Sequence, residues 1–222
     1  MYKRQEQWLD DVALGRQWLS ARLGRAVGLW GLRLGALLAL DHARRAAAPP
    51  QCLLLWQPVH SGSAFLTQFL RLRIANDMLT EDGAPKTGTA ALREQLRGGT
   101  PLEVAGYELA PALAEALDAL DLATMVPPAC PVHWFDVVAA EGRPLTPASA
   151  KLAAAWRAQG VALEVCAVAG PQFWGTQEIA TCPALLEASG AVFGGGADAG
   201  AAGCTGAGAM GHGGAEGASH AV

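Results

Sequence analysis

The stretch Leu29-Trp30-Gly31-Leu32-Arg33-Leu34-Gly35 joins a short apolar run to a helix-forming segment. The apolar run covers residues 26–30, and residues 31–35 form a turn with a glycine at each end. The segment 36–45 that follows is helix-forming and ends in basic residues, which are favourable near a helix C-terminus. The stretch therefore predicts a strand, a sharp turn and a helix, in that order.

Strands and helices are predicted to alternate on either side of a long insertion. Residues 52–56 are wholly apolar, which suits a strand buried on both faces of a parallel sheet. The later part of the chain predicts a strand at 130–138, a helix at 147–159, a strand at 161–168 and a closing helix at 178–188 that is interrupted near Pro183. This alternation is typical of a parallel sheet flanked by helices.

The insertion shows helical spacing of its apolar residues and no strand pattern between residues 63 and 125. Within it, residues 80–99 are glycine-rich and predict an exposed loop with one helical turn at 90–96. We therefore divide the chain into a partial core at 6–62, a helical cap at 63–127, the rest of the core at 128–189 and a disordered Gly/Ala-rich tail at 190–222.

Composition excludes several classes of function. Sixteen Lys and Arg against twenty Asp and Glu give a net charge of −4, so a nucleic-acid partner is not expected. The longest apolar stretch, residues 26–40, contains Arg33 and is shorter than the roughly 18 to 20 residues of a membrane span. We expect no membrane span and a small-molecule substrate or ligand.

The cysteines indicate a reducing compartment. Five cysteines, at positions 52, 130, 166, 182 and 204, show no CxxC motif and no Cys/His pairing at zinc spacing. An odd number of scattered cysteines predicts buried free thiols, and the chain opens with an amphipathic helix rather than a signal sequence. We expect a cytoplasmic protein with no metal and no cofactor.

The turn at residues 31–35 can be compared with the elbow of α/β hydrolases. There a strand runs into a Gly-x-nucleophile-x-Gly turn and then a helix, because only small flanking residues allow so strained a turn. Here the central residue is Arg33, a permanent cation that cannot act as an acyl nucleophile. The backbone pattern indicates this fold, whereas the side chain argues against its usual chemistry.

The other two members of a Ser-His-Asp triad can be sought in the same template. Glu141 follows the strand at 130–138 and occupies the acid position, with Asp136 as an outside candidate. The loop after the last strand, residues 170–174, contains no histidine, and all five histidines lie elsewhere. The standard triad is therefore absent from the chain.

Several motifs resemble one branch of this superfamily, the second type of exosortase A system-associated hydrolase. They are the stretch at 29–35, Leu55-Trp56-Gln57-Pro58 with Ser61-Gly62, Phe65-Leu66 through Arg73, Glu103 to Leu109, and Phe173-Trp174 with Gln177-Glu178-Ile179. The resemblance runs from about residue 8 to residue 186. It implies a bacterial hydrolase that is encoded beside the exosortase, PEP-CTERM sorting and exopolysaccharide machinery.

The chain departs from this family at both ends. Family members carry an upstream half with the first strands of the sheet, so we expect an N-terminally truncated copy that keeps the C-terminal part of an α/β-hydrolase fold. Residues 1–5 are interpreted as an adapter remnant from sequence assembly, and the Gly/Ala tail as a frame slip after Phe193.

Three candidate ligand-binding residues lie at the rim where strands of this fold end. Arg33 is either an anchor for an anion or a structural ion-pair partner of Glu141 or Glu178. Gln57 and His60 follow the strand at 52–56, and His60 is either a general base or an ordinary hydrogen-bonded loop histidine.

Two further candidates lie in the region where the histidine would be expected. Trp174 and Glu178 could give a ligand an aromatic wall and a carboxylate. For Trp174, the alternative is a side chain that anchors a helix to the sheet.

Two functions from different classes remain. The first is hydrolysis of an ester, thioester or related acyl bond within the exosortase and exopolysaccharide system, with Glu141 as the catalytic candidate. The second is a non-catalytic relative that binds a small anionic ligand or a partner protein through Arg33 and the cap.

Overall fold

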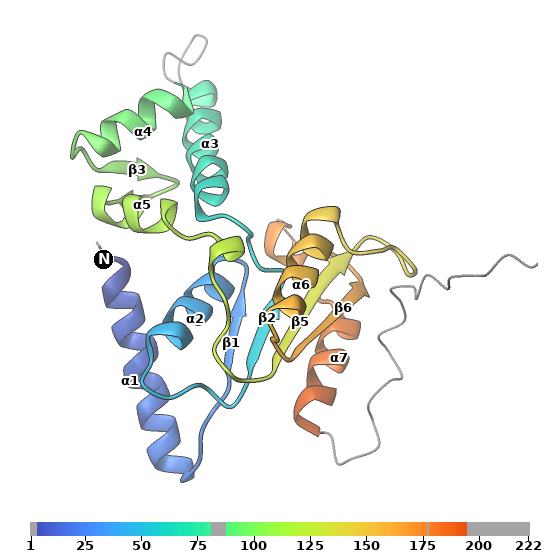
Figure 1. Cartoon of the computed structure of the whole chain (residues 1–222). Coiled ribbons are helices and arrows are strands. Elements are labelled where there is room, and N and C mark those ends of the chain that lie inside the picture. The colour runs from blue at the N-terminus through green and yellow to red at the C-terminus, as the bar shows by residue number, and fades with distance from the viewer. Residues whose placement is uncertain (1–3, 81–87, 177, 195–222) are drawn as a thin grey trace, which may run out of the picture.

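The computed structural model describes residues 4–80, 88–176 and 178–194. In chain order its elements are α1 (Gln5–Leu23), β1 (Leu29–Leu32), α2 (Leu34–Arg45), β2 (Leu53–Trp56), α3 (Gly62–Thr80), α4 (Thr89–Arg97), β3 (Leu102–Val104), β4 (Tyr107–Leu109), α5 (Pro111–Asp118), the 3-10 turn η1 (Leu122–Thr124), β5 (Val132–Val138), α6 (Pro147–Ala158), β6 (Leu163–Ala169), the 3-10 turn η2 (Phe173–Gly175) and α7 (Pro183–Gly194). Figure 1 shows a sheet with helices on both faces and the insertion standing at one end.

The main sheet is parallel throughout and has the strand order β1-β2-β5-β6. Helices α2 and α6 lie against one face and α7 against the other (Figure 1). The predicted fold class, a parallel α/β sheet flanked by helices with a mainly helical insertion, is confirmed. All four residues of β2 are buried, as a strand covered on both faces requires.

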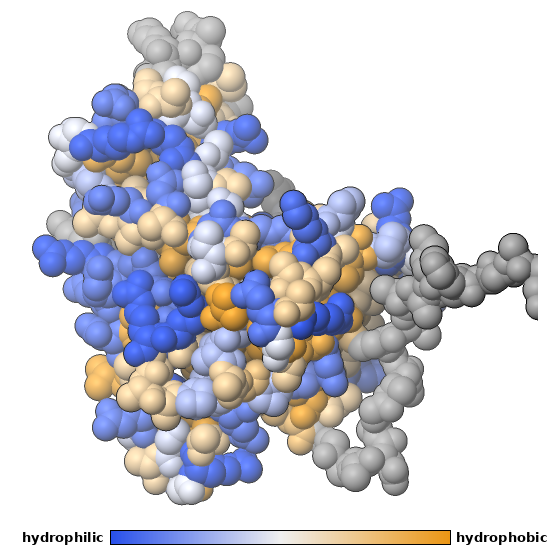
Figure 2. Space-filling model, viewed as in Figure 1, coloured by the Kyte–Doolittle hydropathy of each residue, from blue (hydrophilic) through white to orange (hydrophobic). Residues whose placement is uncertain are grey.

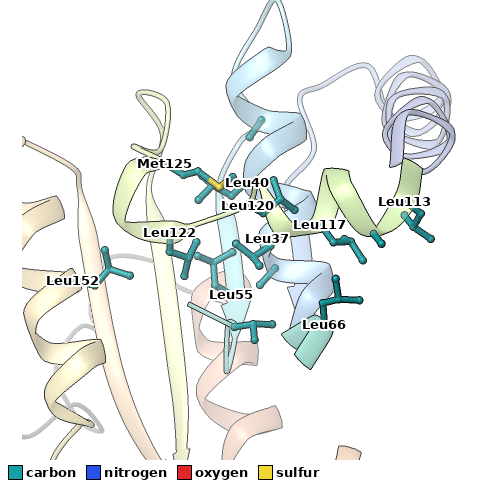
Figure 3. Packing of buried hydrophobic residues seen from close by; sticks show 14 of the residues in the cluster. Leu37, Leu40, Leu55, Leu66, Leu113, Leu117, Leu120, Leu122, Met125 and Leu152 are labelled. Atoms are coloured by element: carbon teal, nitrogen blue, oxygen red, sulfur yellow. The ribbon is translucent and has the colours of Figure 1, made fainter. Parts of the chain in front are cut away.

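Alternate residues of each strand feed two separate hydrophobic clusters. Leu53 and Leu55 join the larger cluster with α2 and α6, whereas Leu54 and Trp56 join the smaller one with α7. The larger cluster continues without a break into the insertion, and Figure 3 shows Leu37 and Leu55 among insertion leucines. The insertion is therefore attached to the sheet through a shared core.

The turn between β1 and α2 depends on one very close backbone contact. A Cβ atom on Gly31 would collide with the carbonyl of Gly35 and the amide nitrogen of Ala36, well inside the 3.0 Å that real Cβ atoms respect. A Cβ atom on Gly35 would meet nothing within 4 Å. The first glycine of the motif is thus required by the packing of α2 onto β1, and the second is not.

The insertion contains a small hairpin that the sequence analysis did not predict. Strands β3 and β4 pair antiparallel through a two-residue turn in which Ala105 and Gly106 have φ of 50° and 80°. Two consecutive positive φ values match a type I′ hairpin turn. The expectation of a strand-free insertion is therefore wrong, because the short alternating run at 102–109 was overlooked. Helix α4 also has nine residues rather than a single turn, and residues 81–87 of the predicted loop lie outside the described part.

One arginine joins three helices of the insertion. Arg93 on α4 binds Asp118 of α5, with Nη1 2.7 and 2.8 Å from the two carboxylate oxygens. Its Nη2 donates to the Ser63 carbonyl oxygen at 2.7 Å and to Thr67 Oγ1 at 2.8 Å, both on α3. This guanidinium therefore ties α4 to both α3 and α5.

Other predictions are corrected at both ends of the closing helix and at one cysteine. Helix α7 begins at Pro183, which suits the first turn of a helix, rather than being interrupted there, and it extends to Gly194 into the predicted tail. Residues 195–222 lie outside the described part. The predicted free thiols are found at Cys52, Cys130 and Cys182, whereas Cys166 is disulfide-bonded and the prediction is wrong there.

Helix α1 forms as predicted, but most of its apolar side chains are not buried. Leu9 is buried, whereas Leu14, Trp18 and Leu23 are each more than half exposed. Within the described residues, no helix is both long and apolar enough to cross a membrane. Figure 2 shows hydrophilic and hydrophobic residues interspersed over the visible face.

The two elbow glycines should respond oppositely to alanine. Because of the backbone collision, Gly31→Ala should lower the free energy of unfolding by about 3 kcal/mol. Gly35→Ala fills open space inside a helix and should raise it by about 0.5 kcal/mol. Urea unfolding of both variants measures the difference, and equal effects would contradict the proposed packing.

Candidate functional site

Side chains from four successive segments gather where the strands of the parallel sheet end. Arg33 follows β1, Gln57 and His60 follow β2, Asp136 lies near the end of β5, and Trp174 lies in η2 after β6. Parallel α/β sheets bind ligands outside the carboxyl ends of their strands. The predicted rim residues are therefore carried to one edge of the sheet.

Arg33 is the tip of the elbow and has a strained backbone. Its φ of 55° and ψ of −118° lie in a region that favours glycine. The strain is held by Arg33 N, which donates to the Trp56 carbonyl at 2.9 Å, and by the Arg33 carbonyl, which accepts from Ala36 N at 3.1 Å. A strained residue that its surroundings hold in place is a frequent feature of functional sites.

The guanidinium of Arg33 is half-buried and lies over an aromatic ring. Its Cζ is 5.8 Å from the ring centroid of Trp174. Within the described residues it makes no ion pair, and neither Glu141 nor Glu178 is paired with it. Burial lowers the pKa of this guanidinium, although arginine remains a cation at neutral pH. Arg33 is thus a partly desolvated positive charge with an aromatic neighbour and, in the part of the chain that the structure describes, no carboxylate partner.

Gln57 extends the hydrogen bonding of the sheet beyond the end of β2. Its φ of 41° turns the chain, its N–H donates to the Phe135 carbonyl at 2.7 Å, and its Oε1 accepts from Val137 N at 2.6 Å. The side-chain oxygen therefore replaces a strand partner. The two N–H groups of its amide remain as donors at the same edge as Arg33.

His60 lies between the sheet and the first turn of α6. Its Nε2 is 3.2 Å from Ser149 Oγ, and its ring stands edge-on to Trp134, with the centroids 5.8 Å apart. Thr146, the N-cap of α6, donates from Oγ1 to Ser149 Oγ at 2.9 Å and accepts from Ser149 N at 3.1 Å. The sequence analysis missed Thr146 and Ser149, although a threonine before Pro147 at a predicted helix start is a recognisable N-cap.

Asp136 is a buried carboxylate with only part of its hydrogen-bonding capacity used. It is 2% exposed, and Oδ1 accepts from Trp134 Nε1 at 2.6 Å. Oδ2 has no hydrogen-bond partner among the described residues. A lone acid inside an apolar strand is an unusual sequence signal, and the structure brings this acid into the electrostatic environment of His60.

The charges around His60 act in opposite directions on its pKa. Burial lowers the pKa below the ordinary value of 6.5, and the positive charge of Arg33 adds to this effect. The carboxylates of Asp136 and Asp121 raise it in part. The net result is a lowered pKa, so the imidazole is neutral at pH 7.

The remaining predicted site residues are placed more peripherally. Glu141 is exposed in the turn after β5, and its assignment as the catalytic acid stays a prediction. Glu178 is exposed and precedes α7 rather than lying on it, and its carbonyl accepts from Thr176 Oγ1 at 2.8 Å. Trp174 is half-buried and packs edge-on against Phe173 beside the smaller hydrophobic cluster, which is compatible with either role predicted for it.

This arrangement lacks a nucleophile at the elbow. Ser149 and His60 form a Ser-His pair, but Ser149 is only 2% exposed, so a substrate carbonyl has no access to its hydroxyl. No group of three or more His, Cys, Asp or Glu side chains in the described ranges could hold a metal ion. What the edge offers instead is the Arg33 cation over Trp174 and, after the neighbouring strand, the side-chain amide of Gln57.

Comparison with known proteins yields structural neighbours only. No family model matches the chain, and no curated protein matches it. The chain is similar to Est1E from Butyrivibrio proteoclasticus, with 13% identity and a TM-score of 0.47 over 75% of this chain, and it spans 61% of the length of that protein. It is also similar to the Vlm2 thioesterase domain, with 17% identity and a TM-score of 0.45 over 86% of this chain and 74% of that one.

A third neighbour is homoserine O-acetyltransferase from Bacillus anthracis, with 15% identity and a TM-score of 0.40 over 73% of this chain and 59% of that one. Such identities bear on fold alone. The chain itself has a strand–turn–helix unit at β1 and α2 and a parallel sheet of strand order β1-β2-β5-β6.

The strain at Arg33 should reverse the usual ranking of alanine and glycine. Arg33→Ala and Arg33→Gly both remove the guanidinium, but only glycine adopts this backbone conformation freely. Arg33→Gly should therefore be about 1 kcal/mol more stable than Arg33→Ala. Chemical unfolding of the two variants tests this, and a less stable glycine variant would show that the elbow stores no strain.

The lowered pKa of His60 should make the fold sensitive to acid. In the unfolded chain His60 takes up a proton near its ordinary pKa of 6.5, whereas in the folded state it does so only at lower pH. Stability should therefore fall as the pH decreases below about 6.5.

The His60→Gln variant should lose stability less steeply between pH 7.5 and 5.5 than the native chain, as measured by urea unfolding. A residual slope is expected from His42, whose pKa is also lowered, chiefly by burial. Identical slopes in the native and variant proteins would contradict the assignment to His60.

Proposed function

We propose that this protein binds a small organic anion at the edge of the sheet, with Arg33 as the anchor. The proposal is carried by one observation, the half-buried guanidinium at the elbow tip that has no ion-pair partner among the described residues. A partly desolvated cation without a carboxylate is costly unless it serves an anion. The strained backbone that presents it supports the same interpretation.

The neighbouring side chains favour a carboxylate as that anion. The planar guanidinium can donate two parallel hydrogen bonds, and the amide of Gln57 adds donors at the same edge. Trp174 offers an apolar wall beside the charge, which suits the hydrocarbon part of an acyl compound. The buried carboxylate of Asp136 disfavours ligands of high negative charge.

Hydrolysis of an ester, thioester or related acyl bond is the second candidate function. His60 favours it, because a neutral imidazole can act as a general base toward water, with Arg33 stabilising the developing oxyanion. The sequence resemblance supports the same class and suggests that the protein works beside the exosortase and exopolysaccharide machinery. Glu141 is the residue proposed as the acid, because it follows β5, where the α/β-hydrolase template has its acid.

The two candidates separate in a binding and turnover experiment on the 222-residue chain. Hexanoate should raise the melting temperature of the native chain, and its affinity should fall at least about tenfold in Arg33→Gly, since a hydrogen bond to a charged group contributes about 1.5 to 3 kcal/mol. Arg33→Lys, which keeps the charge but loses the fork, should bind with intermediate affinity.

Equal hexanoate affinity in the native chain and in Arg33→Gly would contradict the role of Arg33 as the anchor. The same proteins are then mixed with p-nitrophenyl esters of increasing acyl length. Turnover above background that Arg33→Gly abolishes would favour the hydrolase, and no turnover by a chain that binds hexanoate would favour the binding protein.

A further inference from the structure

The hydroxyls of Thr146 and Ser149 form a chain of hydrogen bonds that reaches His60. Thr146 Oγ1 accepts from the backbone N–H of Ser149 and donates its own proton to Ser149 Oγ. Ser149 Oγ then has one proton left. Among the described residues, the remaining polar atom bonded to this oxygen is His60 Nε2, which is 3.2 Å away.

We infer that Thr146 and Ser149 are positioning residues that hold His60 as the tautomer protonated on Nδ1, which makes His60 a hydrogen-bond donor through that nitrogen. A nitrogen that accepts the Ser149 proton carries no proton itself, so in a neutral ring the proton resides on Nδ1. Burial of Ser149 at 2% exposure shields this arrangement from competing water. The lowered pKa of His60 agrees with it, because the chain requires a neutral ring.

The tautomer narrows the class of anion that the edge can bind, and this conclusion rests on the proposed anion site. The charged groups that act on His60 are Asp136, Asp121 and Arg33. Arg33 and His60 follow neighbouring strands at the same edge of the sheet, so an Nδ1–H donor and the guanidinium together suit a ligand with two acceptor oxygens, as in a carboxylate. The same tautomer leaves no free ring nitrogen to accept a proton from water, so it disfavours His60 as a general base.

The tautomer is read directly in the ligand-free protein. Nitrogen-15 NMR of the full chain distinguishes protonated from unprotonated ring nitrogens, and the His60 signals are identified by their loss in His60→Gln. The native chain should show the proton on Nδ1, whereas a proton on Nε2 would overturn the inference whatever any variant does.

Substitution of Ser149 tests whether it sets that state. Ser149→Ala removes the donor to Nε2, so the Nδ1 preference should weaken and His60 should titrate at a higher pH. The matched control is Ser189→Ala, since Ser189 is also buried and its Oγ accepts from Trp56 Nε1 at 2.8 Å. An unchanged His60 signal in folded Ser149→Ala would contradict the positioning role, as would an equal change in the control.

Hexanoate binding by two variants of His60 tests this inference separately from the proposed function. The amide of asparagine mimics the Nδ1–H of histidine, whereas the amide of glutamine mimics Nε2. His60→Asn should therefore keep most of the affinity for hexanoate, and His60→Gln should lose about tenfold.

The reverse ranking of the two variants would overturn the donor role. If the tautomer is as inferred but hexanoate does not bind the native chain, the proposed function fails while the positioning role of Ser149 and Thr146 stands.

Discussion

Helix α2 leaves strand β1 with its first backbone atoms pressed against Gly31, and the position of Arg33 at the tip of the elbow depends on that contact. Without a side chain at this glycine, the chain can reverse within one residue and lift Arg33 above the sheet. The hydrogen bond from Arg33 N to Trp56 then ties the elbow to β2, whose end carries Gln57. A methyl group at residue 31 would separate helix from strand and move the guanidinium away from the other strand ends.

Much of this framework could be predicted from the sequence because its signals are local. A wholly apolar run such as Leu53–Trp56 predicts a strand that is covered on both faces of a parallel sheet. The spacing of the two glycines indicated the elbow. The prediction of short elements was wrong, because their hydrophobic pattern is too short to be distinguished from that of the longer segment around them. Strands β3 and β4 have three residues each, so a helical periodicity assigned over sixty residues concealed the Ala105-Gly106 turn. Similarly, Pro183 was interpreted as a break although it begins a helix.

The candidate site could be predicted only in part, because its chemistry depends on side chains that are distant along the chain. The rim position of Arg33, Gln57 and His60 followed from strand order alone. What the sequence could not show is that Ser149, 89 residues after His60, bonds to its imidazole. Nor could it show which carboxylate acts on that ring. The hydrolase template places the acid in the loop that contains Glu141. In the structure it is the carboxylate of Asp136, in the strand itself, that raises the pKa of His60.

The position of the Arg33 guanidinium over Trp174 gives the site an optical consequence of its own. Indole emission is sensitive to a nearby charge, and a carboxylate that draws the cation off the ring changes the field across it. Trp174 is one of seven tryptophans in the chain, so this change is superimposed on a constant background from the others. If the edge binds an anion as proposed, its occupancy changes the intrinsic fluorescence of the protein, and no attached dye is needed to follow it.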